Sequence, residues 1–507
     1  MKTKAILAGF LLAATTATAG GILTNTNQSV AFLKNPARDA AIGLDGVYSN
    51  PAGVVLMPEG FHLAFNWQYA HQTRTIDSNN PVFAMGKKNN GSTTKRFEGI
   101  ADAPFIPSVQ AAYNKGNWSY QFNFSIPAGG GACEFDKGLG SFESAVGTIA
   151  SMLSTMDPSV KGYDVDGYMR GRQYYFGFQV GAAYKINEHW SVYGGLRALY
   201  GNASYKARLS NIQVMQQNTD GNIYPTEFSK YINTSLESIT KLRQKNADGM
   251  ALSVEERVAL ARGDAAFTLL ERMQPYSHGV NLMSNQEGFG VAPIIGADYR
   301  IGDFNFAVKY EFNTQMKMKN RSTLEQPLVL SGAFGSMPAI NNINKFADDI
   351  EVDEDIPAML AVGAQWSALP ELRLNAGYHH YFDKNAHWFG DTQDKLDYGA
   401  NEYLGGVEWD ASEKVNISCG FQITRYGLTD DYMNDLSFVV NSYSVGAGIS
   451  YKVSDKVTLT AAYFQTNYDD YDKTTTHTNV TDGSTYQTSD SFTRTNRVLG
   501  LSCQVDF

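Results

Sequence analysis

Apolar and polar residues alternate one by one along much of the chain. Residues 61–70 read FHLAFNWQYA, in which every second side chain is large and apolar or aromatic. A period of two predicts a β-strand with one apolar face, whereas a helix repeats its apolar residues every three or four positions. We count about fourteen such segments. They lie at roughly 61–72, 104–114, 118–127, 173–184, 189–205, 288–299, 303–315, 356–366, 371–382, 401–409, 414–424, 440–452, 456–467 and 492–507.

The connections between these segments alternate between short and long. Short turns such as 114–117 and 453–455 follow one end of the strands, and the longest connections, at about 128–172, 206–287 and 316–355, follow the other end. Short turns on one side and long loops on the other are typical of outer-membrane barrels. A closed barrel also leaves no strand edge unpaired in lipid. The sequence therefore predicts an all-β fold, a transmembrane antiparallel β-barrel of about 14 strands with its long loops outside the cell.

Two of the long loops carry a second pattern. Apolar residues recur at helical spacing in residues 142–156 and again in residues 226–273. We therefore expect the extracellular loops to contain helices. The apolar faces of these helices either cap the barrel mouth, form an apolar entry groove, or simply pack against one another.

The composition agrees with such a barrel and excludes other classes of protein. The 507 residues are 43% hydrophobic and 12% aromatic but only 18% charged, and the mean hydropathy is −0.29. A polytopic helical membrane protein needs repeated apolar runs of about 20 residues, and the single comparable run, at the N-terminus, is shorter. The net charge of −10 argues against a nucleic-acid partner, which requires a basic surface.

The first residues form a targeting signal. Lys2 and Lys4 precede an apolar stretch that is too short to span a bilayer, and an Ala-Thr-Ala cleavage motif ends at Ala19. These features predict a signal peptide at residues 1–19 and export from the cytoplasm.

No sequence motif points to a cofactor, a metal or a catalytic centre. The three cysteines are too few and too scattered for a disulfide framework, and the CxxC, HExxH and phosphate-binding loop motifs are absent from the sequence. A barrel hydrolase is one alternative, because His379, Tyr381 and Asp383 share one face of a predicted strand. Packing in the lumen is the simpler interpretation of this group, so we expect no catalytic residue, no metal site and no enzyme activity.

A polar, turn-rich segment precedes the first strand. Residues 20–60 are too long and too polar for a strand, so they form either a periplasmic tail or a plug in the lumen. The sequences FLKNPA at 32–37, DAA at 39–41 and YSNPAG at 48–53 resemble the hatch pattern of the FadL/TodX family of outer-membrane transport proteins. The resemblance covers the whole mature chain, but outside this segment it is architectural.

The resemblance implies a hatch at residues 20–60 that is folded inside a fourteen-stranded barrel formed by residues 61–507. It implies uptake of hydrophobic molecules, long-chain fatty acids or aromatic hydrocarbons, across the outer membrane of a Gram-negative bacterium, and of these we expect long-chain fatty acids. A PorV-like branch of the same barrels shuttles cargo proteins in secretion, and this alternative stays open. The hatch and gating residues implied here are Asn35, Pro36, Asn50, Pro51, Ala52 and Gly53.

Uptake of this kind requires an external apolar site, and a fatty-acid carboxylate favours a cation in the lumen. The candidate ligand-binding residues are Phe267, Leu270 and Phe334 in the loops and Arg197, Lys309 and Arg373 on the polar faces of strands. Lys309 shares its face with Glu311, so an ion pair between these two residues is the alternative to a ligand role.

Exit in this family is lateral, through a kinked strand. Pro127 and Gly129, at the end of the third predicted strand, weaken ladder pairing and are the candidates for this opening; the alternative is the start of a loop. The terminal strand ends in Phe507 and resembles the signal that the barrel assembly machinery recognises. The expected partners are thus a fatty acid or other hydrophobic molecule, outer-membrane lipid and lipopolysaccharide, and the assembly machinery, with the protein itself a monomer.

Overall fold

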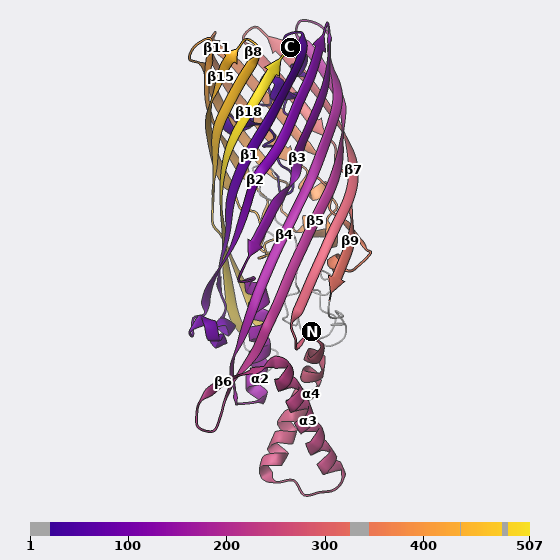
Figure 1. Cartoon of the computed structure of the whole chain (residues 1–507), viewed down its shortest axis with the longest axis vertical. Coiled ribbons are helices and arrows are strands. Elements are labelled where there is room, and N and C mark those ends of the chain that lie inside the picture. The colour runs from indigo at the N-terminus through magenta and orange to yellow at the C-terminus, as the bar shows by residue number, and fades with distance from the viewer. Residues whose placement is uncertain (1–20, 325–343, 437, 479–484) are drawn as a thin grey trace.

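The computed structural model of the protein describes residues 21–324, 344–436, 438–478 and 485–507. The predicted signal peptide and the candidate Phe334 lie outside these residues. The described chain forms a closed antiparallel β-barrel, with helices gathered at one end and the carboxyl terminus at the other (Figure 1).

Fourteen antiparallel strands make the wall, which confirms the number predicted from the alternating pattern. Three of them are interrupted, so that β8 continues into β9, β10 into β11, and β16 into β17, while the short β6 extends the edge of β5. The strands are β1 (Gly60–Asn79), β2 (Thr94–Lys115), β3 (Trp118–Phe135), β4 (Val160–Lys185), β5 (Trp190–Gln217), β6 (Ile223–Glu227), β7 (Val280–Ile301), β8 (Phe304–Glu311), β9 (Lys317–Leu324), β10 (Glu351–Asp353), β11 (Met359–Leu369), β12 (Leu372–Tyr381), β13 (Asn401–Asp410), β14 (Val415–Arg425), β15 (Ser442–Ser454), β16 (Val457–Tyr468), β17 (Tyr471–Thr478) and β18 (Thr485–Asp506).

The sheet closes because the first strand is paired along both edges. β1 is hydrogen-bonded to β2 on one side and to the last strand, β18, on the other. Leu63, for example, lies opposite Ala111 of β2 and opposite Val505 of β18. Closure satisfies the backbone groups that an open sheet edge would expose.

Several strands run much further than the alternating pattern predicts. β4 has 26 residues and β5 has 28, and their outer ends occupy residues 160–172 and 206–217, which we predict as loop. Backbone pairing between the two strands continues to Val160 opposite Gln216. The outward side chains of these ends are largely polar, and inward ones such as Ala207 and Leu209 are apolar and buried, so the alternation reverses its phase although the ladder continues.

The long loops contain the expected helices. They are α2 (Gly140–Met156), α3 (Phe228–Ala247) and α4 (Val254–Met273), which confirm the helical spacing. Ser253 and Glu256 begin α4 with a capping box, in which each side chain accepts a hydrogen bond from the other's backbone N–H. α3 and α4 form a hairpin that projects from the barrel (Figure 1).

No helix in the described part of the chain is long and apolar enough to cross a membrane.

The outward face of the barrel is an apolar band bordered by aromatic side chains. Near the short turns Trp190 packs against Tyr299, with ring centroids 4.4 Å apart. Towards the helices Phe176, Tyr200 and Phe289 form one row across β4, β5 and β7. Two aromatic girdles around an apolar band are typical of barrels that sit in a bilayer.

The inward face carries polar side chains, and most of them are buried. Asn66, Gln68, Gln110, Gln121 and Asn123 all face the lumen with little exposure. A water-filled pore would leave such groups accessible to solvent. The lumen is therefore filled, and the chain that fills it is the segment that precedes β1.

Candidate functional site

Residues 21–59, here called the N-terminal segment, lie inside the barrel. They include the helix α1 (Val30–Lys34) and two short 3-10 turns, η1 (Leu44–Val47) and η2 (Gly53–Leu56). α1 packs beside β14, β15, β16 and β18, whereas η1 and η2 pack beside β2, β3 and β4. α1 and η1 also both contact β1, so the segment lines a continuous arc of the wall from β14 round to β4.

The wall makes room for this segment by placing glycine at inward positions. A Cβ on Gly406 of β13 would overlap the side chain of Asn35, and a Cβ on Gly420 of β14 would lie 2.7 Å from Cδ of Pro36. Only glycine permits so close an approach of two chains. Asn35 and Pro36 of the predicted hatch therefore pack directly against the backbone of β13 and β14.

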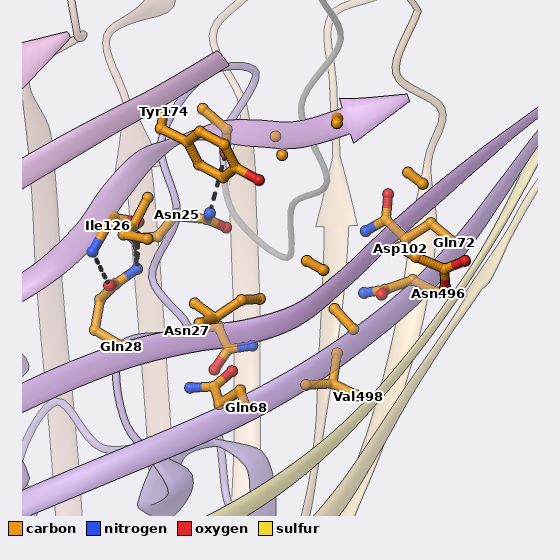
Figure 2. A pocket seen from close by; sticks show the side chains of 18 residues that line it. Asn25, Asn27, Gln28, Gln68, Gln72, Asp102, Ile126, Tyr174, Asn496 and Val498 are labelled. Carbon is orange, nitrogen blue, oxygen red and sulfur yellow. Dashed lines mark hydrogen bonds between the residues drawn. The ribbon is translucent and has the colours of Figure 1, made fainter. Parts of the chain in front are cut away.

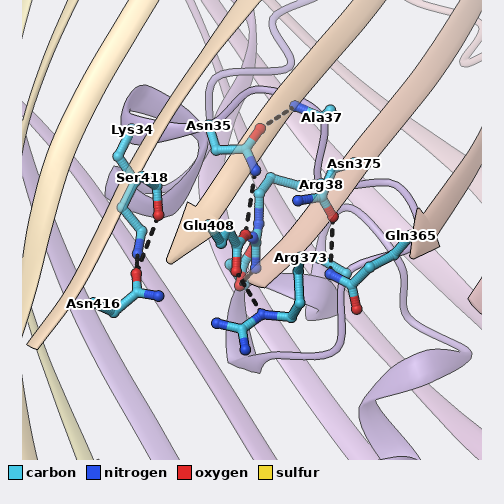
Figure 3. A network of polar contacts seen from close by, with 12 residues as sticks. Lys34, Asn35, Ala37, Arg38, Gln365, Arg373, Asn375, Glu408, Asn416 and Ser418 are labelled. Atoms are coloured by element: carbon cyan, nitrogen blue, oxygen red, sulfur yellow. Dashed lines mark hydrogen bonds and ion pairs between the residues drawn. The ribbon is translucent and has the colours of Figure 1, made fainter. Parts of the chain in front are cut away.

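Figure 3 shows a polar network that joins α1 and the following turn to β12 and β13. Glu408 accepts hydrogen bonds from Asn35 and Arg38, and Nε of Arg373 lies 3.4 Å from the same carboxylate. Arg38 also pairs with Asp45 at 2.7 Å. Burial opposes a charged guanidinium, but the two carboxylates hold the pKa of Arg38 above its ordinary value. The network therefore fixes the segment through buried ion pairs.

A second link joins the segment to the same two strands. Nε2 of His379 lies 2.8 Å from Oδ1 of Asp39, and Nδ1 of His379 lies 2.8 Å from Oε2 of Glu402. Tyr381 donates to the same Glu402 carboxylate at 2.7 Å. Two of the three residues that suggested a hydrolase are thus engaged in holding the N-terminal segment.

The predicted lumen cations Arg197 and Lys309 meet at one carboxylate. Glu311 lies 2.5 Å from Nη1 of Arg197 and 2.8 Å from Nζ of Lys309. Lys309 also donates to the carbonyl oxygen of Tyr48 at 2.7 Å, and both cations lie over the Tyr48 ring. The ion pair between Lys309 and Glu311 is present, so a ligand carboxylate here competes with Glu311. The third cation, Arg373, pairs with Asp410 at 2.7 Å.

The NPAG motif lies at the short-turn end of the lumen. Asn50 donates to Asp298 of β7 at 2.7 Å and accepts from the backbone N–H of Gly53 at 3.2 Å, which holds the turn together. The carbonyl oxygens of Pro51 and Ala52 accept hydrogen bonds from side chains of β3 and β5. The structure therefore anchors this motif to three separate strands.

The wall itself is interrupted between β2 and β3. Their pairing runs from the short turn up to Val109 opposite Phe124 and resumes at Ile100 opposite Glu134. The intervening stretch of β2, residues 101–108, contains two prolines, which have no N–H to donate to a ladder. Two neighbouring strands of the wall are therefore parted over several residues.

The third strand bulges at the same place. Its register against β4 shifts on either side of Ala128, so that β3 carries an extra residue at each shift. Gly129 has φ +89°, and a Cβ there would lie 2.6 Å from the carbonyl oxygen of Gln173. Glycine is required at this position. Pro127 and Gly129, the lateral-exit candidates, thus lie within a strand and not at the start of a loop.

The N-terminal segment covers this interruption from inside the barrel. Thr24 forms an antiparallel bridge with Ala128, flanked by backbone hydrogen bonds of 2.7 and 3.2 Å. The side chain of Gln28 accepts from the N–H of Ile126 at 3.1 Å and donates to its carbonyl oxygen at 3.1 Å. Groups that β2 leaves unpaired on β3 are therefore satisfied by the segment.

A narrow pocket remains between the segment and the parted strands (Figure 2). Its lining includes Asn25, Asn27, Gln28, Gln68, Gln72, Ile106, Ile126, Gly129, Tyr174, Asn496 and Val498. The cavity volume is about 50 Å³, and one water molecule takes about 30 Å³ in the liquid. A long acyl chain therefore does not fit here unless the N-terminal segment moves.

A second cavity, almost entirely apolar, lies at the helical end of the barrel. It measures about 90 Å³ and is enclosed by α2, the outer ends of β4 and β5, and the end of α4. Its lining includes Val146, Ile149, Leu153, Phe228, Met273 and Val280. Of the predicted capture residues, Leu270 is buried in the adjoining apolar cluster, and Phe267 packs at its edge beneath Arg243.

Solved structures of a FadL homologue and of a toluene transporter superpose on nearly the whole chain. A Pseudomonas aeruginosa FadL homologue superposes with a TM-score of 0.60 at 12% identity, over 99% of this chain and 100% of its own. The chain has the FadL/TodX fold. The Ralstonia pickettii toluene transporter TbuX superposes with a TM-score of 0.50 at 13% identity, over 94% and 98% of the two chains. No family model and no curated protein matches the sequence.

Some features of this FadL-type barrel have no signal in the sequence. Arg74 of β1 and Arg494 of β18 lie directly opposite each other, both buried and both on the inward face. Alternation along each strand indicates which face each arginine occupies, but their juxtaposition depends on barrel closure. The prolines of β2, by contrast, could have been recognised, since proline inside a predicted strand indicates interrupted pairing.

The described residues of the FadL-type barrel contain no group of three or more His, Cys, Asp and Glu side chains that could hold a metal ion. Asp383, the third residue of the hydrolase hypothesis, lies beyond β12 in a 3-10 turn, where burial raises its pKa to about 6. His379 and Asp383 therefore belong to different surroundings.

Proposed function

We propose that this FadL-type barrel carries hydrophobic small molecules, chiefly long-chain fatty acids, across the outer membrane of a Gram-negative bacterium. The observation that supports this most is the interruption between β2 and β3, which the N-terminal segment covers from inside. Phe105, on the interrupted stretch of β2, is 60% exposed. A gap at that point leads from the lumen into an apolar environment, which suits a hydrophobic solute and not a polar one.

Transport follows a path through three of the features described above. The solute is captured at the apolar cavity between α2 and α4, which at about 90 Å³ takes a long acyl chain only after these helices move. It then enters the lumen and leaves between β2 and β3. Residues 20–60 act as the hatch and the Asn35-Pro36 and NPAG turns are its hinges, so gating is a movement of this segment and involves no chemical step. Residues 61–507 form the barrel, and residues 1–19 direct export.

A fatty acid also brings a carboxylate into a lumen rich in buried charge. Arg197, Lys309 and Arg373 are the proposed partners for it, and each would exchange a wall carboxylate for that of the ligand. The bond lost and the bond formed are both charge-assisted, so each exchange replaces one contact with another of the same kind. Exchange at Lys309 also releases a contact to Tyr48, which couples ligand binding to hatch movement.

The remaining parts of the proposal concern the surroundings of the barrel. The barrel assembly machinery inserts it, and it works as a monomer among outer-membrane lipid and lipopolysaccharide. It is a transporter and not an enzyme.

Uptake of labelled oleate tests the proposed function. Expression of the full chain in a Gram-negative host that lacks its own fatty-acid uptake protein is expected to restore oleate uptake. If oleate uptake stays at the background of the host while folded protein is present in the outer membrane, the proposal is wrong. Co-purification of a secreted protein would then favour the secretion shuttle.

Replacing Ile149 with Glu is expected to weaken oleate capture by about tenfold. Ile149 lines the apolar cavity, and a charge placed there must be partly desolvated when the acyl chain binds; about 1.4 kcal/mol of this cost is enough for a tenfold effect. The concentration of oleate that gives half-maximal uptake measures the effect. Val258→Glu is the matched control, because Val258 lies on α4 but is 46% exposed. Equal effects of the two variants would contradict capture in this cavity.

A further inference from the structure

Four basic residues gather on the outward face of β4 and β5, at the end near the helices. They are Arg170, Arg172, Lys206 and Arg208, here called the basic cluster. Arg170 lies directly opposite Lys206, and the other two follow at two-residue intervals on the same face. Like charges directly opposite each other weaken a strand pair. A chain whose net charge is −10 nevertheless places four cations on this small area.

The basic cluster begins just beyond the outer aromatic girdle. Trp190, in the girdle near the short turns, and Tyr200, in the outer girdle, are ten positions apart on β5. Ten residues at about 3.4 Å each, on a strand tilted by about 45°, rise by about 24 Å, close to the height of the apolar band of an outer-membrane barrel. Lys206 lies six positions further along β5. The basic cluster is therefore placed at the level of lipid headgroups, next to the hydrocarbon layer.

The surroundings of the basic cluster leave it an excess of positive charge. Glu134 lies 3.8 Å from Nε of Arg170, and both side chains are more than 40% exposed, so the attraction is weak. Arg172 donates to the neutral side chain of Asn202 at 2.7 Å, and the guanidinium of Arg208 lies 5.7 Å from the centre of the Tyr168 ring.

A large polar hollow adjoins the cluster on its outer side. It has a volume of about 580 Å³, within the range of small-molecule sites, and Arg208 and Tyr168 form part of its wall. Lys88, Lys95 and Lys137 line it as well, together with Asp136, Glu143 and Asp166. Glu143 pairs with Lys95 and Asp166 with Lys88, so ion pairs within the hollow account for two of the three acids. The hollow therefore offers both hydrogen-bond donors and hydrogen-bond acceptors beside the basic cluster.

We infer that the basic cluster binds the phosphate groups of a phosphorylated glycolipid in the outer leaflet, with the adjoining hollow receiving part of its sugar headgroup. Guanidinium groups bind phosphate oxygens in pairs of parallel hydrogen bonds, and three of the four cations are arginine. The acyl chains of such a lipid lie against the apolar band below, while its phosphates lie where the cluster begins. The inference rests on the proposed outer-membrane location, but it does not depend on which molecule is transported.

The contact has a consequence for transport. α2 and the outer ends of β4 and β5 enclose the apolar capture cavity on the inner side of the same strands. A lipid held on the outer side fixes these strand ends, which extend beyond the apolar band. The glycolipid therefore acts as a brace for the entry site, and no part of it enters the lumen.

Binding of defined lipids to the purified full-length protein tests this inference. Lipid A with two phosphates is expected to bind, and the triple variant Arg170→Gln/Lys206→Gln/Arg208→Gln is expected to bind it at least tenfold more weakly. A dephosphorylated lipid A is expected to bind both proteins equally weakly. The charge-matched control is Lys452→Gln/Lys456→Gln/Arg497→Gln, in which three exposed cations elsewhere on the barrel are removed; it is expected to bind like the wild type.

The inference is overturned if the cluster variant and the control bind lipid A equally, or if the wild type does not distinguish phosphorylated from dephosphorylated lipid. Heat-dependent mobility in gel electrophoresis shows that each variant is folded. Oleate uptake, measured in parallel, separates the two proposals. Loss of lipid A binding together with reduced oleate uptake supports both the lipid site and its role as a brace, and loss of lipid A binding with normal uptake overturns the brace. If no protein takes up oleate but lipid A binding follows the cluster, the transport proposal alone is removed.

Discussion

Oxidation of the double variant Thr24→Cys/Ala128→Cys is expected to lower oleate uptake by about tenfold or more, and reduction is expected to restore it. The two residues form an antiparallel pair flanked on both sides by backbone hydrogen bonds. Such a pair brings its Cα atoms to about 4.5 Å, which suits a disulfide. The bridge would hold the N-terminal segment over the interruption, so that a cavity of about 50 Å³ cannot widen. Labelled oleate uptake before and after addition of dithiothreitol measures the effect.

The two single cysteine variants, treated in the same way, control for oxidation elsewhere. They are needed because the buried Cys133 is also on β3. Cross-linked protein that still transports oleate at the normal rate would show that the ligand leaves the barrel by another route.

Replacing Arg38 with Ala is expected to cost about 3–5 kcal/mol of the free energy that holds the N-terminal segment in the lumen. Asp45 and Glu408 both place buried carboxylates against this guanidinium, and removal of one partner leaves buried charge uncompensated. A loss of about 3 kcal/mol raises the population with a displaced segment by about a hundredfold. Hydrogen exchange of residues 30–57, followed by mass spectrometry, measures this population.

Arg373→Ala is the matched control for that measurement. Arg373 approaches the same Glu408 carboxylate, but its side chain is 23% exposed and its other partner, Asp410, is 39% exposed. Exposed ion pairs contribute about 0–1 kcal/mol, so exchange in residues 30–57 should rise by no more than about fivefold. If the two variants exchange alike, the segment is not held by the Arg38 ion pairs.

The barrel was predictable from local pattern because its physical cause is local. A strand between lipid and a polar lumen must alternate, and residues 61–70 show this without reference to any other part of the chain. The outer ends of β4 and β5 were missed because the alternation reverses beyond the apolar band, where outward residues such as Arg170 and Lys206 are polar and their inward neighbours are apolar.

The site was less predictable because it depends on distant partners. Residues of the N-terminal segment such as Asn50 resemble a known hatch pattern, but their wall partners, among them Asp298, are separated from them by hundreds of positions and are selected only by the path of the chain through the lumen. The cations Arg197 and Lys309 were correctly placed on inward faces, and the ion pair of Lys309 with Glu311 was one of its two predicted roles. The contact of Arg197 with Glu311 and the position of the Tyr48 ring follow instead from the pairing of β5, β7 and β8 and from the path of the N-terminal segment. Alternation shows which side chains face inward but not which of them meet.

A photoreactive fatty acid with a diazirine at the end of its chain tests the lateral route most directly. Irradiation of outer membranes that contain the protein during uptake, followed by mass spectrometry, would locate the labelled residues. The account predicts adducts around Ile106, Ile126 and Tyr174, where the wall is parted. Adducts confined to the short-turn end of the lumen, near Asn114 and Ser191, would show that the ligand leaves along the barrel axis and would contradict the account.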